Sequence, residues 1–148
     1  MQTVHQTQAL HVIGIELRTH NGEAQQTIPA FWQRFSAEAP LQALPHRLSS
    51  DVLAVYTHFA HAGVDNAGPY SLVIGAEVAP ETEVPTGMVR VVVPASQRAL
   101  FTVPAGRHDL VGPAWQAIWE RHALRKTYIA DYERYGTDGA IGIFVGIA

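Results

Sequence analysis

One structural pattern occurs twice along the chain, and this repeat restricts the folds that the chain can adopt. In each half, a strand-like segment is followed by a segment with helical spacing that a proline opens, and then by two more strand-like segments. Residue types agree at three places in the same order: Pro29-Ala30-Phe31 with Pro113-Ala114-Trp115, Tyr56-x-x-Phe59 with Tyr132-x-x-Tyr135, and Val73-Ile74-Gly75 with Phe144-Val145-Gly146. The repeat predicts a duplicated β-α-β-β unit.

Hydrophobic spacing sets the expected elements. The first helix is predicted to start at Thr27, with Pro29 just inside it, and to end before Pro40. The second helix is predicted to open at Pro113 and to fade near Arg125. Alternation of apolar and polar residues and β-branched composition predict strands at residues 11–19, 52–59, 70–78, 88–93, 99–103, 131–135 and 140–147.

Two such units lead to a specific α+β architecture. Paired about a pseudo-twofold axis, they make one mixed or antiparallel sheet with two helices on one face and a ligand cleft at the seam between the repeats. Repeat 1 is expected at about residues 10–80 and repeat 2 at about residues 97–148. With 148 residues the chain is long enough for one well-buried core, so residues 1–148 are expected to form a single domain.

Composition excludes several classes of function. The chain has no cysteine, which rules out disulfides, thiolate metal sites and a thiol nucleophile. Its net charge is −3 and its ten basic residues are not clustered, so nucleic-acid binding is not expected. Without a signal pattern or a long apolar run, a cytoplasmic location and no membrane partner are expected. Five Tyr, five Phe and three Trp in such a weakly charged chain suggest a binding role.

Short motifs spread over both halves carry a resemblance to a known family. They are Ile28-Pro29-Ala30-Phe31-Trp32, Tyr56-Thr57, Val73-Ile74-Gly75-Ala76-Glu77-Val78, Trp115-Gln116-Ala117-Ile118-Trp119, Asp131-Tyr132-Glu133-Arg134-Tyr135 and Ile143-Phe144-Val145-Gly146-Ile147. In order and spacing, from about residue 11 to the end, the chain resembles the gyrase-inhibitor-like effector-binding domains. These occur alone or fused behind the DNA-binding helices of AraC-type and MerR-type regulators. The resemblance implies the duplicated β-α-β-β (SHS2) fold and a groove for lipophilic, often cationic, drugs or dyes.

The resemblance places the family's pocket glutamate at Glu133. Alternation along the strand puts this side chain on the face of Asp131 and Tyr135 and opposite Tyr132. The repeat makes Thr57 its counterpart. A carboxylate buried in an aromatic cavity must find a partner, become protonated or await a cationic ligand. The alternative is an exposed strand glutamate paired with a nearby arginine.

Aromatic side chains are expected to form the walls of the cleft. Phe31 and Trp32 are neighbours on a helix and differ by about 100° around its axis, so they cannot both face the sheet. Tyrosine hydroxyls on the strands can orient a polar group. The expected wall residues are Trp32, Tyr56, Trp115, Trp119 and Tyr135.

Glu77 is a further ligand-binding candidate. It shares a strand face with Gly75, whose missing side chain leaves space that a ligand could occupy. A glycine also precedes Glu16 by two residues. For both glutamates the alternative is a solvated strand residue.

Other chemistry has little support in the sequence. Among the eight histidines, His58 and His61 are three apart, but no acid recurs at a ligand interval, so no metal is expected. No serine lies in a glycine-flanked elbow, and a strand rather than a helix follows Gly136 and Gly139. No catalytic residue and no cofactor are therefore assigned.

The predicted function is binding of lipophilic cationic aromatic compounds, for effector sensing or sequestration. The family's fused members carry a helix-turn-helix segment for which there is no room before His11, so direct DNA binding is not expected. One alternative is a hydrolase of reactive small molecules, with Glu133 as general base and Tyr135 or Tyr56 as acid. The other is a protein-interaction module that acts on gyrase or on a transcription regulator. The expected state is a monomer or weak dimer.

Overall fold

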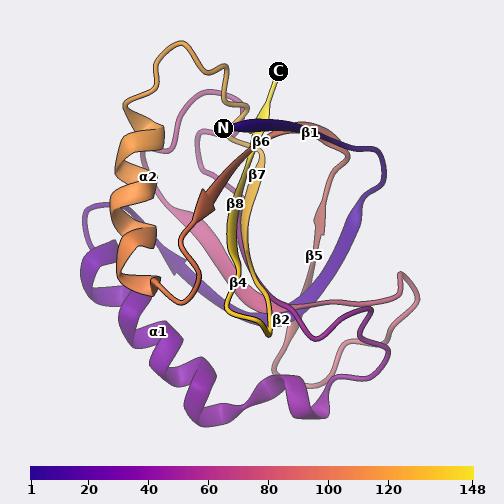
Figure 1. Ribbon diagram of the computed structural model, residues 1–148. Coiled ribbons are helices and arrows are strands. Elements are labelled where there is room, and N and C mark those ends of the chain that lie inside the picture. The colour runs from indigo at the N-terminus through magenta and orange to yellow at the C-terminus, as the bar shows by residue number, and fades with distance from the viewer.

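Eight strands form one antiparallel sheet, and two helices lie on the same side of it (Figure 1). The computed structural model describes all residues, 1–148. The strands are β1 (Gln2–Gln6), β2 (Leu10–Thr19), β3 (Val52–Thr57), β4 (Tyr70–Glu77), β5 (Val89–Val93), β6 (Ser96–Val103), β7 (Ala130–Tyr135) and β8 (Ile141–Ile147). The helices are α1 (Ala24–Glu38) and α2 (Val111–Trp119), with short 3-10 helices η1 (Pro40–Ala43) and η2 (His108–Leu110).

The sheet order confirms the duplicated unit. The strands are arranged β1-β6-β8-β7-β3-β4-β2-β5, so the units β2-α1-β3-β4 and β6-α2-β7-β8 occupy the two halves of the sheet. Their second strands, β3 and β7, pair antiparallel at the centre, with Ala54 opposite Glu133. The seam between the repeats therefore runs between β3 and β7.

The strand register corrects one detail of the predicted repeat. The matched triplets of β4 and β8 make Leu72 equivalent to Ile143. Leu72 pairs with Tyr56, and Ile143 pairs with Glu133. The counterpart of Glu133 is therefore Tyr56, and the predicted counterpart Thr57 is wrong by one residue. Because side chains alternate between faces, a shift of one residue moves the counterpart to the opposite side of the sheet.

The first helix begins one turn earlier than predicted. The Glu23 carbonyl accepts hydrogen bonds from the backbone N–H groups of Gln26 and Thr27, at 2.9 and 3.0 Å, and the Thr27 hydroxyl donates to the same carbonyl. These contacts start α1 at Ala24 and leave Pro29 inside the helix. Since proline has no N–H, the carbonyl four residues earlier lacks its helical donor.

Two further differences come from pairing with distant strands. Helix α2 ends at Trp119 rather than near Arg125, because the following segment returns to the sheet, where the Thr127 N–H donates to the Gly146 carbonyl at 2.9 Å. Strand β1 was not predicted. Its polar sequence has no clear alternation, and it is held by pairing with β6.

Both faces of the sheet are covered by apolar side chains. On the helix face, Phe31 of α1 packs with Leu72 and Ile74, and Ile118 of α2 packs with Ile143. On the other face the sheet bends, so that residues of the edge strand β5 pack against residues of β3, β4 and β7. Neither helix is long and apolar enough to cross a membrane.

Candidate ligand-binding site

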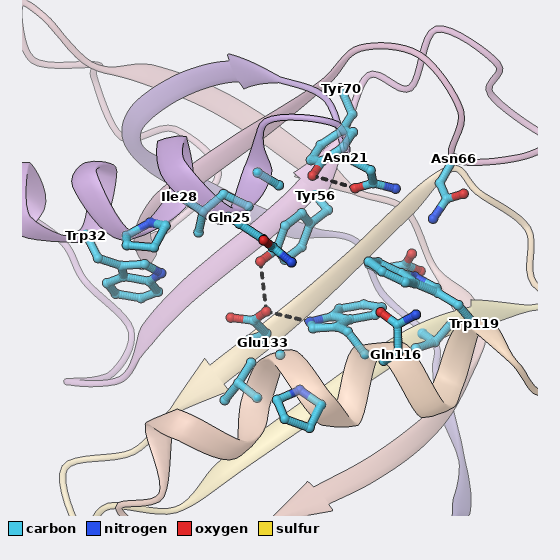
Figure 2. Close-up of a pocket in the computed structure, with 18 of the residues that line it drawn as sticks. Asn21, Gln25, Ile28, Trp32, Tyr56, Asn66, Tyr70, Gln116, Trp119 and Glu133 are labelled. Carbon is cyan, nitrogen blue, oxygen red and sulfur yellow. Dashed lines mark hydrogen bonds between the residues drawn. The ribbon is translucent and has the colours of Figure 1, made fainter.

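A cavity of about 1090 Å³ lies over the seam between the repeats and is lined by residues of both helices and of the sheet (Figure 2). Each helix buries only one residue fully, Phe31 in α1 and Ile118 in α2. The cavity is lined by a different stripe of each helix, with spacings of three and four residues. The lining residues are Ala24, Gln25, Ile28, Pro29, Trp32, Phe35 and Ser36 in α1, and Val111, Gly112, Pro113, Trp115, Gln116 and Trp119 in α2.

Glu133 lies on the central strand β7 and is 1% exposed. The Tyr56 hydroxyl and the Trp115 indole N–H both donate to its Oε2, at 2.8 and 2.7 Å, and the Tyr135 hydroxyl donates to its Oε1. Figure 2 shows the carboxylate between Tyr56 of β3 and helix α2. All three donors are neutral. None of the ion pairs in the structure includes Glu133.

Burial dominates the electrostatics of this group. It raises the pKa of Glu133 above the ordinary value for glutamate, while the hydrogen bonds from Tyr135, Trp115 and Tyr56 act in the opposite direction. Burial and the nearby carboxylate raise the pKa of Tyr56 and of Tyr135, so both hydroxyls stay protonated and serve as donors. Burial and Glu133 also raise the pKa of Tyr70 to about 12. The cavity can therefore hold a negative charge that no cation of the protein neutralises.

Aromatic rings surround the carboxylate. The Trp32 and Tyr135 rings meet edge-on with centroids 5.2 Å apart, and Tyr56 and Trp115 do so at 5.5 Å. His108 stacks on Tyr135 at 5.6 Å. This arrangement combines the apolar faces that a flat or bulky ligand contacts with one charged group that can orient it.

Six of the seven residues that the sequence assigned to ligand binding line this cavity. They are Trp32, Tyr56, Trp115, Trp119, Glu133 and Tyr135. Trp119 is 37% exposed, whereas the other five are less exposed. Phe31 is buried in the core, whereas Trp32 packs against the edge of this core and lines the cavity, in agreement with their angular separation on the helix. The exposed, arginine-paired alternative for Glu133 is wrong, because this carboxylate is buried and its donors are neutral.

Glu77 lies outside the cavity, contrary to its assignment. Its strand alternation places it on the face opposite the helices, where its carboxylate lies 3.5 Å from Arg134. Arg134 also bonds to Asp51 at 2.9 Å. The space expected beside Gly75 is not available to a ligand, because the backbone of Ile13 in β2 occupies it.

Several lining residues were not identified from the sequence. Gln25 and Gln116 fall on the same helical stripes as the tryptophans. Gln25 precedes the predicted start of the first helix, so a correct start would have indicated it, whereas Gln116 already lay within the predicted second helix. Asn21, whose side-chain carbonyl accepts from the Tyr70 hydroxyl at 2.9 Å, comes from a turn and has no local signal. Asp131 was predicted to share the face of Glu133 but was not assigned to the site.

Comparison with family models gives the family. The model Cass2, described as integron-associated effector binding protein, matches residues 3–143. The chain belongs to this family. No curated protein is similar enough in sequence to count as a match.

Solved structures show the same fold at low sequence identity. The integron cassette protein VCH_CASS2 from the mobile metagenome of Vibrio cholerae has a TM-score of 0.77 at 18% identity, over 99% of this chain and 95% of that one. SAV2435 bound to tetraphenylphosphonium has a TM-score of 0.78 at 18% identity, over 99% and 93%. A protein described as a bacterial transcription regulation protein, from Staphylococcus aureus MU50, has a TM-score of 0.72 at 18% identity, over 99% and 95%.

Proposed function

We propose that the protein binds lipophilic aromatic cations in the cavity between α1, α2 and the sheet, and that Glu133 anchors the positive charge. One observation carries this proposal: a carboxylate buried on the cavity side of β7 accepts hydrogen bonds only from neutral donors. The negative charge of such a carboxylate has no counter-charge until a cation enters the cavity from outside the protein.

The expected interaction energies favour a cationic ligand over a neutral one. Opposite unit charges about 4 Å apart attract by about 4 kcal/mol at an effective dielectric constant of about 20. A cation placed over the face of an aromatic ring gains about 0.5–2 kcal/mol. Trp32, Tyr56, Trp115 and Tyr135 supply such rings next to the carboxylate. A neutral ligand of the same shape would obtain only the apolar part of this energy.

The relatives support the same class of ligand. The family is described as effector-binding, and the similar protein SAV2435 was solved with tetraphenylphosphonium, a lipophilic cation. On this basis we assign the protein to sensing or sequestration of such compounds. The cytoplasmic location remains a prediction from the sequence. A transcription regulator or gyrase is the partner class that the sequence resemblance suggests for downstream action.

Three phenyl-substituted ligands of different charge test the proposal: a cation and an anion of similar shape, and a smaller neutral compound. Isothermal titration calorimetry would compare tetraphenylphosphonium, neutral triphenylphosphine oxide and anionic tetraphenylborate at pH 7.5. We expect the cation to bind at least about tenfold more tightly than the neutral compound, and the anion to bind least. Equal affinity for the cation and the neutral compound would contradict the role of Glu133.

The same preparation separates binding from hydrolysis. The hydrolase alternative requires Glu133 to activate water, and so predicts product from a cationic aryl ester during long incubation. A binding protein returns this ester intact at the rate of a protein-free control. Chromatography of the recovered ligand measures the difference.

A further inference from the structure

Asp131 is a second buried carboxylate in the same cavity. It lies on β7 two residues before Glu133, on the same face, and is 7% exposed. Its Oδ1 accepts a hydrogen bond from the backbone N–H of Gly146 at 2.8 Å. No other hydrogen bond to this carboxylate is present, and none of the ion pairs includes it.

The nearest positive side chains are bonded elsewhere. Lys126 also lines the cavity, and its ammonium group donates to the carbonyl of Arg121 at 2.9 Å. The buried guanidinium of Arg98 donates to Gln6 and to the carbonyls of Ala130 and Pro94. Burial raises the pKa of Asp131 to about 6, although the hydrogen bond from Gly146 and the charges of Arg98 and Lys126 act in the opposite direction. Above this pH the cavity therefore contains a second negative charge without a direct partner.

Strand geometry sets the backbone spacing of Asp131 and Glu133. Residues two apart on one strand face are separated by about 7 Å. Tyr56 is the cross-strand partner of Asp131, and its hydroxyl donates to Glu133, so one aromatic side chain connects the two positions. The cavity volume of about 1090 Å³ is slightly above the range of about 300–1000 Å³ for ligand sites, which leaves room for a ligand with two polar ends.

We propose that Asp131 forms a second anionic subsite, and that the preferred ligands are aromatic dications whose positive centres lie about 7 Å apart. One centre binds at Glu133 among Tyr56, Trp115 and Tyr135, and the other at Asp131 beside Tyr128 and Val145. The inference rests on the proposed function, because it assumes that cations enter this cavity. Once the first centre is bound, the second is held close to its carboxylate, which raises the affinity without a new protein contact elsewhere.

Two quaternary ammonium compounds test this subsite, because their charges do not change with pH. The dication is para-xylylene-bis(trimethylammonium), whose centres have about the required spacing, and the monocation is benzyltrimethylammonium. In calorimetry at pH 7.5 we expect the dication to bind at least about tenfold more tightly, beyond the statistical factor of about two. Asp131→Asn should reduce the advantage of the dication over the monocation to about the statistical factor, whatever affinity the monocation itself loses with the charge of Asp131. The control Asp51→Asn, at a carboxylate that pairs with Arg134 outside the cavity, should change neither.

The outcomes separate this inference from the proposed function. If tetraphenylphosphonium does not bind the wild-type protein, the proposed function fails. If it binds but the dication has no advantage over the monocation, the subsite is refuted and the proposed function stands. A second comparison needs no variant, in case Asp131→Asn does not fold. The ortho isomer brings its charges too close together to reach both carboxylates, so it should bind at least about fivefold more weakly than the para isomer, and equal binding refutes the subsite.

Discussion

Replacing Glu133 by glutamine removes the negative charge of this side chain from the cavity and keeps the shape of the side chain. Tyr56 and Trp115 both donate to Oε2, a position that the glutamine carbonyl oxygen can take. The glutamine amide group then occupies the Oε1 position, where Tyr135 can rotate its hydroxyl and accept instead of donate. The three contacts are retained, so the change isolates the contribution of the charge.

The expected loss follows from the burial of the site. At about 6 Å between a ligand's cationic centre and the carboxylate, an effective dielectric constant of about 20 gives an attraction of about 3 kcal/mol. That corresponds to a roughly hundredfold increase in Kd for tetraphenylphosphonium in Glu133→Gln. With the dielectric constant of water, about 80, the same charges would attract by about 0.7 kcal/mol, a roughly threefold effect. The 1% exposure of Glu133 favours the larger figure.

Calorimetric titration of three proteins with two ligands measures this loss. The proteins are the wild type, Glu133→Gln and the matched control Glu77→Gln, which removes a strand carboxylate outside the cavity. Only Glu133→Gln should lose affinity for tetraphenylphosphonium, and triphenylphosphine oxide should change by less than about threefold in every protein. The reasoning is refuted if the Glu133 variant retains the cation within threefold, or if the neutral ligand loses as much affinity as the cation.

Four further outcomes are expected. Because burial raises the pKa of Glu133, affinity for tetraphenylphosphonium should fall on acidification at a pH above the ordinary pKa of glutamate. An affinity that does not change between pH 8 and pH 4.5 would contradict this. The same pKa shift means that Glu133 binds a proton more readily in the native state than in the unfolded state. The free energy of unfolding therefore falls as pH rises from the unfolded-state pKa to the folded-state pKa of Glu133. At pH 8, urea titrations should show that Glu133→Gln is more stable than the wild type. Gly75→Ala should lower the free energy of unfolding measured in urea by at least about 3 kcal/mol, because the new Cβ would collide with the backbone of Ile13. The control Gly112→Ala, at an open helical position, should leave this free energy unchanged or raise it. Trp115→Phe removes one donor to Glu133 and should move the acidic loss of ligand binding to higher pH, and an unchanged midpoint would show that this hydrogen bond does not tune the carboxylate.

Local sequence patterns predicted much of the fold. Alternation and turn residues predicted both hairpins and the central strands, and matched motifs predicted the duplicated unit that the sheet order confirms. The errors lie where a distant partner decides. Strand β1 has a polar sequence and exists through pairing with β6. The repeat equivalence of Glu133 was displaced by one residue, because motif similarity does not report which face of a strand a residue occupies.

The two strand glutamates show where the sequence stops and the tertiary structure begins. Alternation alone determined that Glu133 shares a strand face with Asp131 and Tyr135, and that Glu77 shares one with Gly75. It could not determine which face the helices cover. The pairing of β3 with β7 and the docking of α2 bring Tyr56 and Trp115 to Glu133, while Glu77 faces Arg134 on the other side. Burial of a charge depends on groups far away in the chain, so only the folded structure distinguishes the cavity carboxylate from the one paired with arginine.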